Sequence, residues 1–335
     1  MHLGAAALLA LTIAGSAAAE IEVIAVALTP PTGVTRDRFN DMAAIIAEKF
    51  EGGGRMTALL DGQAGSEEAM AAALRRGRVH VAQLTIPGIA SAVPELSVLM
   101  APYLFDSFAE EDFVLDRHVM PLASELFAAR GLELFGFSDS GWFIAFTRDP
   151  LPGPDAAKGR RLRAAGGDAS RLFLSAIGAD VVEMPFADLI PALQTGLVQG
   201  GVTNVLMYEM ANLVREAPYL IMTRHAVNPG ANAANKAWFE NLSPANQVLI
   251  RNGLGPMIDM RNGVRREMDQ GIANLIKAGV QVHDPGQPEL AVWKARGRAT
   301  HAELIERIGG RAQDLYDAIT AGKRAYADEA SRASR

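Results

Sequence analysis

The residues best suited to specific chemistry are three arginines in the segment RRLRA at 160–164. A guanidinium presents a planar fork of donors that matches a carboxylate, and it stays charged at any working pH. The segment reads as a short strand, in which alternation places Arg161 and Arg163 on one face and Arg160 on the other. The sequence therefore offers a candidate carboxylate-binding face, with three solvated surface charges as the alternative.

No set of residues with catalytic or metal-binding spacing accompanies these arginines. The six histidines lie at 2, 80, 118, 225, 283 and 301 without the spacing of metal ligands, and neither HExxH nor a P-loop occurs. The chain has no cysteine, which excludes thiolate-bound zinc, cysteine-ligated iron–sulfur clusters and a cysteine nucleophile. We expect no metal, no cofactor and no catalytic residues.

One segment, GFSDSG at 136–141, is similar to the GxSxG nucleophile elbow. Its spacing differs because Gly141 lies three residues after Ser138, and a strand follows where the elbow needs a helix. We therefore expect Ser138 and Ser140 to shape a turn between domains. The nearest carboxylates, Asp139, Glu183 and Asp188, form no persuasive acid/base pair.

Length and composition indicate a globular chain of about two domains. It has 335 residues, 49% of them hydrophobic and 21% charged, with a formal net charge of −6. The acidic balance gives no support for nucleic acid as a partner.

The first nineteen residues predict export. Residues 5–13 read AAALLALTI, which is too short to span a bilayer as a mature helix, and Ala17-Ala18-Ala19 before Glu20 fits a small-x-small cleavage site. A retained N-terminal anchor is the alternative, since no Lys or Arg precedes the apolar run. We expect a signal peptide at 1–19, a periplasmic mature chain from Glu20, and no membrane-spanning segment thereafter.

The order of elements predicts an α/β fold. Strands are expected at 22–28, 56–60 and 79–84, separated by helices that Thr35 and Ser66 cap, which indicates a largely parallel sheet. Further on, 132–137 and 142–147 read as strands on either side of SDSG, followed by strands at 160–164 and 181–184. Helices are expected at 119–130, 170–177 and 188–195.

The last third of the chain is predicted to be helical. Ser243 is a helix cap with Pro244 at the first helical position. If the helix runs on to Lys277, it is about 50 Å long, with Pro256 as a kink. Such a helix is long enough to brace two domains.

Residues 158–204 resemble the solute-binding subunits of TRAP transporters (tripartite ATP-independent periplasmic transporters). The motifs that carry the resemblance are Lys158-Gly159, Arg163, Gly178-Ala179, Met184-Pro185-Phe186, the ALQTG block at 192–196, Val198, Gly200 and Asn204. The APYLFDS segment at 101–107, Pro94-Glu95, Thr223-Arg224-His225 and AWFENLSPANQ at 237–247 extend it over nearly all of 20–310.

The resemblance implies a site in a cleft between two domains. It places the substrate-carboxylate arginine at Arg163, with Phe186 as an apolar wall and Asn204 as a donor to a ligand oxygen. Gln83 and Thr85 end the third predicted strand, and ligands of open α/β sheets bind outside the carboxyl ends of strands. The same reasoning makes Pro30–Gly33 a lip of the cleft.

One position departs from the family pattern. Many members carry a second arginine where this chain has Phe143, next to Trp142. The wall there is therefore expected to be apolar and aromatic, and the ligand bulkier or less charged than a small dicarboxylate. Trp142 is equally compatible with the cleft and with the core.

These observations predict a two-domain α/β fold of the periplasmic binding protein type. By resemblance, the first domain is 20–141 plus 230–268 and the second is 142–229 plus 269–335, with a long helix across both. The implied function is capture of an organic acid and its delivery to TRAP membrane subunits, without making or breaking a bond. The alternatives are an exported ligand-binding sensor subunit and an exported α/β hydrolase or lyase.

Overall fold

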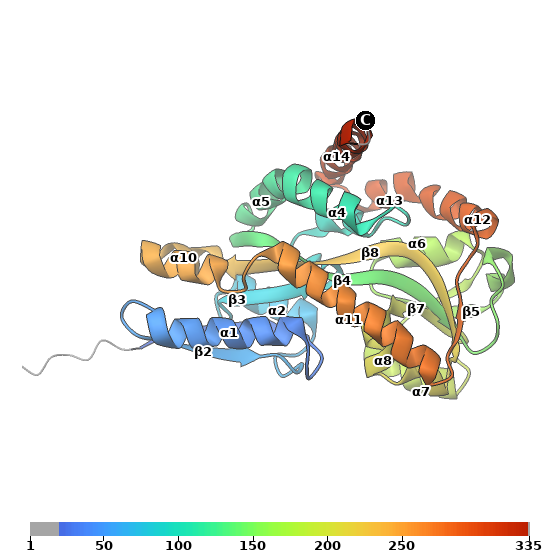
Figure 1. Cartoon of the computed structure of the whole chain (residues 1–335), viewed down its shortest axis with the longest axis horizontal. Helices are drawn as coiled ribbons and strands as arrows, with labels where there is room; N and C mark the ends of the chain where they lie inside the picture. Colours follow the sequence, from blue (N-terminus) through green and yellow to red (C-terminus); the bar gives the residue numbers. More distant parts are fainter. Residues whose placement is uncertain (1–19, 334–335) are drawn as a thin grey trace, which may run out of the picture.

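The fold is built on one continuous sheet, seen in a computed structural model that describes residues 20–333 (Figure 1). The predicted signal peptide at 1–19 lies outside the described residues. The strand order is β2-β1-β3-β8-β4-β7-β5-β6, and β9 pairs with β8. The strands are β1 (Ile21–Ala27), β2 (Gly54–Leu59), β3 (Val81–Thr85), β4 (Leu132–Thr147), β5 (Arg161–Ala164), β6 (Asp180–Glu183), β7 (Gly200–Asn204), β8 (Tyr219–Asn235) and β9 (Gln281–His283).

The sheet is parallel at its two ends and antiparallel in the middle. β1 pairs in parallel with β2 and β3, and β5 pairs in parallel with β6 and β7. Between these parts, β8 runs antiparallel to β3 and β4, and β4 runs antiparallel to β7. The expectation of a largely parallel sheet is thus confirmed for the first three strands. It does not hold at the centre, where the antiparallel strands β4 and β8 connect the two parallel parts.

The segment GFSDSG does not form the turn that the sequence predicted. It lies inside β4, a single strand of 16 residues that continues through both predicted strands. Its pairing with β8 shifts between Asp139 and Trp142, so the strand carries an irregularity there rather than an end. Gly141 has φ +77°, and a Cβ on it would lie 1.6 Å from Met268 Sδ, so this strand position needs glycine.

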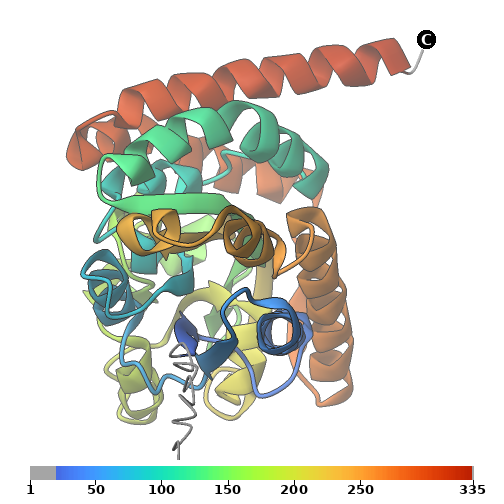
Figure 2. The same ribbon diagram turned by 90° about the vertical axis from the view of Figure 1, so that its left-hand side faces the viewer.

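Helices cover both faces of the sheet (Figures 1 and 2). They are α1 (Val34–Lys49), α2 (Glu67–Arg75), α3 (Ile86–Ile89), α4 (Phe108–Val114), α5 (Met120–Ala128), α6 (Asp168–Ala176), α7 (Leu189–Gln194), α8 (Val205–Met210), α9 (Lys236–Glu240), α10 (Pro244–Asn252), α11 (Met257–Lys277), α12 (Gln287–Arg298), α13 (His301–Ile308) and α14 (Ala312–Ala333). The helix predicted at 119–130 is α5, which continues from α4 through a π-helical turn at Leu115–Val119.

The long helix expected from 244 to 277 is two helices. Gly255 has a positive φ of +73°, and Pro256 stands before α11 in extended conformation, so the chain turns between α10 and α11. The remaining helix α11 has 21 residues and is therefore about 31 Å long. It still lies along β4 and reaches from α1 to α8, as Figure 1 shows.

Two of the three predicted helix caps are confirmed. Ser66 accepts a hydrogen bond from the Ala69 N–H, and Ser243 accepts one from the Asn246 N–H. The cap at Thr35 is wrong, because α1 begins at Val34 after Gly33, which supplies no side-chain cap. The cap comes from a distant part of the chain, as described below.

Separate apolar clusters stabilise the two ends of the sheet. One joins β1 and α1 to α10, around Phe39, Met42 and Ile46, and another joins the end of β4 to α7 and α8, around Phe146 and Tyr208. At the chain's end, α14 packs on α4, with Lys323 Nζ 2.9 Å from Glu110 Oε2 (Figure 2).

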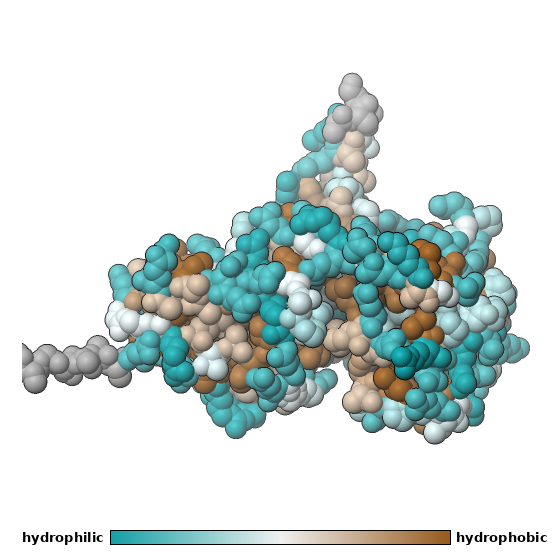
Figure 3. Space-filling view, turned by 60° about the horizontal axis from the view of Figure 1, so that its bottom comes forward, coloured by the Kyte–Doolittle hydropathy of each residue, from teal (hydrophilic) through white to brown (hydrophobic). Residues whose placement is uncertain are grey.

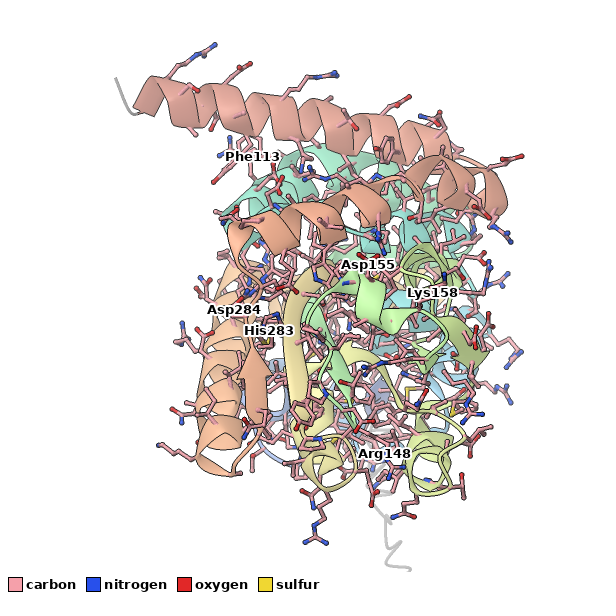
Figure 4. The ribbon with its side chains drawn as sticks, turned by 90° about the vertical axis from the view of Figure 1, so that its right-hand side faces the viewer. Phe113, Arg148, Asp155, Lys158, His283 and Asp284 are labelled. Carbon is pink, nitrogen blue, oxygen red and sulfur yellow. The ribbon has the colours of Figure 1, made fainter. Side chains whose placement is uncertain are left out.

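The outer side of β8 is bordered by β9, which pairs with it in parallel. Directly after β9, Asp284 accepts two hydrogen bonds from Arg224, at 2.7 and 2.9 Å; Figure 4 labels Asp284 beside His283. This bidentate pair ties the segment that follows β9 to β8.

Candidate functional site

A cavity of about 750 Å³ opens between the two parallel parts of the sheet. The face of the molecule in Figure 3 is hollowed between its left-hand and right-hand parts. The walls of the cavity come from the carboxyl ends of β1, β3, β5, β6 and β7, from the middle of β4 and β8, and from α11. This is the place where ligands bind in α/β sheets. The predicted lip, Pro30–Gly33, contributes Pro30, Thr32 and Gly33 to the lining.

Arg163 lies in the wall of this cavity and is 5% exposed. Its Nε donates to the Met184 carbonyl at 3.3 Å and its Nη1 to the Val202 carbonyl at 3.5 Å, both long contacts. It forms no ion pair within residues 20–333. Burial lowers the pKa of Arg163 to about 10, so the side chain is charged at neutral pH. A buried cation without an anion is costly unless something else supplies one.

The other two arginines of the segment lie outside the cavity lining. Arg160 donates to the Pro150 carbonyl at 2.9 Å, and Arg161 is exposed and donates to the Gly196 carbonyl at 2.7 Å. Of the three candidates, the structure thus places Arg163 alone at the cavity.

Phe186, Asn204 and Phe143 also line the cavity. The Phe186 ring lies 5.6 Å from the Arg163 guanidinium carbon, within the range of a cation–π contact. Asn204 ends β7 and caps α8, where its Oδ1 accepts from the Met207 N–H at 2.8 Å, which leaves its amide donors for other partners. Phe143 is paired with Asn204 across β4 and β7.

Gln83 and Thr85 line the opposite side, at the end of β3. Gln83 Nε2 donates to Ser138 Oγ at 3.0 Å, while its Oε1 is buried with no hydrogen-bond partner among the described residues. Thr85 caps the short helix α3 and donates its hydroxyl to Glu67 Oε2 at 2.5 Å.

Trp142, for which the sequence left the cleft and the core open, is not brought to the cavity. It is absent from the lining, and its ring lies 5.0 Å from that of Phe108 at the start of α4. Successive side chains of a strand point to opposite faces, so the neighbour of Phe143 faces away from the cavity. Of the two positions that the sequence left open, the structure shows the packed one.

Several lining residues were missed by the sequence reasoning. Glu67 lies next to the predicted cap Ser66, and Glu267 falls within the predicted long helix, so neither was considered as a site residue. Thr29 and Asn228 were assigned no role. The rule that ligands bind at strand ends would have pointed to Thr29, which lies two residues after β1. Asn228 carried no such signal, because β8 was not predicted as a strand.

A buried ionic cluster adjoins the cavity at Asp139, which is one of the lining residues. Arg265 of α11 binds Asp112 through two hydrogen bonds of 2.7 and 2.9 Å, and its Nε donates to Asp139 Oδ2 at 2.8 Å. Glu111, with no exposed surface, lies 3.3 Å from the same guanidinium. Burial, together with the charge of Asp139, raises the pKa of Glu111 well above its usual value. Asp139 is therefore held by a cation rather than free for acid/base work.

The described histidines and carboxylates do not form a metal site. Between residues 20 and 333, no group of three or more His, Asp or Glu side chains is arranged to hold a metal ion. His225, beside the cavity wall, stacks on Phe173 with ring centroids 4.1 Å apart, and burial lowers its pKa to about 3. This histidine is an uncharged packing residue at neutral pH.

Comparison with known proteins agrees with this geometry. Residues 26–307 match the family described as bacterial extracellular solute-binding protein, family 7. The chain belongs to this family. The resemblance to TRAP solute-binding subunits that the sequence motifs indicated is thereby confirmed, as is the two-part α/β fold with a cleft.

Relatives in family 7 have names that cover several ligand chemistries. The chain is 25% identical over 251 residues to the 2,3-diketo-L-gulonate-binding periplasmic protein of Escherichia coli, covering 74% of this chain and 76% of the relative. It is 25% identical over 258 residues to the C4-dicarboxylate-binding periplasmic protein of Rhodobacter capsulatus, with 74% and 76% covered. The names therefore indicate no single ligand.

A solved structure shows the same fold. The periplasmic ectoine-binding protein of a TRAP transporter from Halomonas elongata superposes with a TM-score of 0.83 at 19% identity, covering 91% of this chain and 99% of the other. Within residues 20–333 we find no helix that has the length and apolar character needed to cross a membrane.

Proposed function

We propose that this family 7 protein captures an organic acid and delivers it to the membrane subunits of a TRAP transporter. The observation that carries the proposal is Arg163, a buried cation in the cavity wall with no anionic partner in the described chain. A carboxylate that enters the cleft loses its hydration, and a fixed guanidinium offsets that loss. In this proposal the ligand is bound and released unchanged, as befits a solute-binding family.

The proposed assembly of the site uses two lobes. We propose that residues 20–141 with 230–268 form the first lobe and residues 142–229 with 269–335 the second. Arg163, Phe186 and Asn204 belong to the second lobe, while Gln83 and Thr85 belong to the first. A ligand that touches both sides stabilises a closed state, and β4, β8 and α11, which cross between the lobes, are where bending is expected. α14, which belongs to the second range, packs on α4 of the first.

We also propose that the chain is exported and works in the periplasm after cleavage before Glu20. The support is the apolar run followed by Ala17-Ala18-Ala19, together with the extracellular placement of family 7. Intact-mass measurement of the protein recovered from the periplasm should give a chain that begins at Glu20. A mass that includes the first nineteen residues would show a retained anchor instead.

A panel of organic acids should raise the melting temperature of the purified protein. A ligand that binds only the folded state stabilises it by about 2.7 kcal/mol at a hundredfold excess over its dissociation constant. Thermal-shift measurements over monocarboxylates, dicarboxylates, hydroxy acids and amino-substituted acids test this, with neutral sugars and polyamines as controls. If only the sugars or polyamines shift the transition, the carboxylate proposal is wrong.

A further inference from the structure

The charges that line the cavity are unevenly distributed. Arg36 is paired with Asp61, Asp139 with Arg265, and Glu183 lies 3.3 Å from Arg171. Glu68 is exposed and therefore solvated. Among the lining residues, this leaves one cation, Arg163, and two partly buried carboxylates, Glu67 and Glu267, without ion pairs in the described chain.

Glu67 is held in the wall by the end of β3. Its Oε1 accepts from the Thr85 N–H at 2.7 Å, and its Oε2 accepts from the Thr85 hydroxyl at 2.5 Å. Burial raises the pKa of Glu67, and its two hydrogen bonds with Thr85 only partly offset that rise. A carboxylate fixed in a poorly solvated wall without a cation destabilises the empty protein, which is typical of a group arranged for a ligand.

Glu267 reaches the same cavity from α11. Its Oε1 accepts from the Val34 N–H at 2.6 Å and so caps α1, the helix that lacks a cap of its own. A Cβ on Gly33 would lie 3.0 Å from Glu267 Oε1, so glycine at the lip lets this carboxylate approach the backbone. Burial raises the pKa of Glu267 as well. Its second oxygen has no hydrogen bond within residues 20–333.

Unpartnered oxygens lie on the same wall. Thr29, which is 6% exposed, and Asn228, which is 3% exposed, both line the cavity, and Thr29 Oγ1 and Asn228 Oδ1 are buried without a hydrogen-bond partner in the described chain. Gln83 Oε1 is a third such atom. Buried polar oxygens are rarely left unpaired, so turning these side chains toward a donor in the cavity would relieve a cost that the empty protein carries. We call Thr29, Glu67, Gln83, Asn228 and Glu267 the acceptor wall.

The acceptor wall and Arg163 come from different proposed lobes. Four of the five wall residues fall in 20–141 or 230–268, and Asn228 lies two residues before the second range, whereas Arg163 lies in the other lobe. A second carboxylate on the ligand would meet negative charge and acceptors here. A positively charged nitrogen would meet its complement, and it would offer the donors that the oxygens lack.

We infer that the cavity is built for a zwitterionic acid, whose carboxylate binds Arg163 and whose cationic nitrogen lies against the acceptor wall. This inference rests on the proposed function, which it narrows to one ligand class. It also accounts for Phe143 in place of a second arginine, because the ligand has one carboxylate to neutralise. Closure of the two proposed lobes then depends on a ligand that carries opposite charges at its two ends.

Matched probes of one chain length test the inference. We would titrate the full protein with 5-aminopentanoate, 5-hydroxypentanoate and glutarate, which share a carboxylate and differ at the far end as ammonium, hydroxyl or carboxylate. The four- and six-carbon series and gluconate complete the set. At the best length, we expect the amino acid to bind at least tenfold more tightly than its hydroxy and dicarboxylate partners.

Two variants connect that preference to the wall. Glu67→Gln and Glu267→Gln remove the charge and keep an oxygen that accepts from Thr85 or Val34. Each should lower the ratio of amino acid to hydroxy acid affinity at least fivefold, and the ratio is insensitive to a small loss of folded protein. Glu48→Gln, at an exposed site on α1 outside the cavity, is the matched control and should leave the ratio unchanged.

The outcomes separate this inference from the proposed function. The inference is overturned if glutarate, a hydroxy acid or gluconate binds more tightly than every amino member, or if neither glutamine variant changes the ratio. Binding of those other acids that is lost in Arg163→Ala would leave the proposed function in place. Absence of binding by every acid would remove both.

Discussion

Replacing Arg163 with alanine should weaken organic acid binding by about a hundredfold or more. The change removes both the charge and the donor fork that face the cavity, and truncating one partner of a buried charged pair costs several kcal/mol, of which about 3 kcal/mol corresponds to that factor. Arg163→Lys keeps the charge but loses the planar fork, so it should also bind markedly less tightly than the parent. Titration calorimetry with the best acid of the panel measures both variants.

The same substitution should not destabilise the empty protein. Arg163 forms two long hydrogen bonds to carbonyls and has no anion in the described chain, so its removal relieves a desolvated charge. The melting temperature of ligand-free Arg163→Ala is thus expected to equal or exceed that of the parent. Arg160→Ala, which removes a guanidinium outside the cavity, is the control. Near-parental binding by Arg163→Ala, or loss in Arg160→Ala instead, would contradict the site assignment.

Local chemistry made the outer parts of the fold predictable. β1, β5 and β6 carry compact apolar or alternating patterns. Ser66 and Ser243 cap their helices because each side chain accepts a hydrogen bond from the N–H three residues further along the chain. The position of Arg163 at the cavity was predicted from strand alternation together with a family motif. In each of these cases the deciding contacts lie within a few residues along the chain.

The centre of the sheet was not predictable in this way. β4 and β8 pair over residues far apart in sequence, and β8 has small and polar residues such as Asn228 and Gly230 that do not alternate as a half-buried strand does. Gly141 looks like a turn residue in sequence. In the structure it is needed because Met268 of α11 packs against it, a contact that no local pattern contains.

The acceptor wall shows the same limit. Glu67 has the sequence context of a helix start, where a carboxylate suits the helix dipole, and its contact with Thr85 depends on how α2 lies on β3. Glu267 caps α1 from 233 residues away, which is why Thr35 was mistaken for the cap. Long-range contacts of single side chains decide these positions.

Replacing Arg265 with methionine should destabilise the protein by about 3–5 kcal/mol, the usual cost of breaking a buried ion pair from one side. Asp139 and Glu111 have no exposed side-chain surface, and both contact this guanidinium. Without it, the two carboxyls remain buried with their nearest cation gone. Denaturant unfolding of Arg265→Met measures the loss. Arg266→Met, at the adjacent and exposed position of α11, is the control and should change stability little.

The pH dependence of that loss identifies its cause. Burial raises the pKa of Glu111 and of Asp139 even with Arg265 present, and removing the cation raises both further. A carboxyl whose pKa is higher in the folded than in the unfolded state favours folding at low pH, and this contribution disappears as the pH rises through the folded-state pKa. The deficit of Arg265→Met should therefore shrink as the pH falls from 8 toward 5.

Adding Glu111→Gln and Asp139→Asn should restore part of the stability at pH 8, since neither of these two positions then carries an uncompensated buried charge. A deficit that is independent of pH, or no recovery in the triple variant, would show that Arg265 acts through packing against Phe108 and not through its charge.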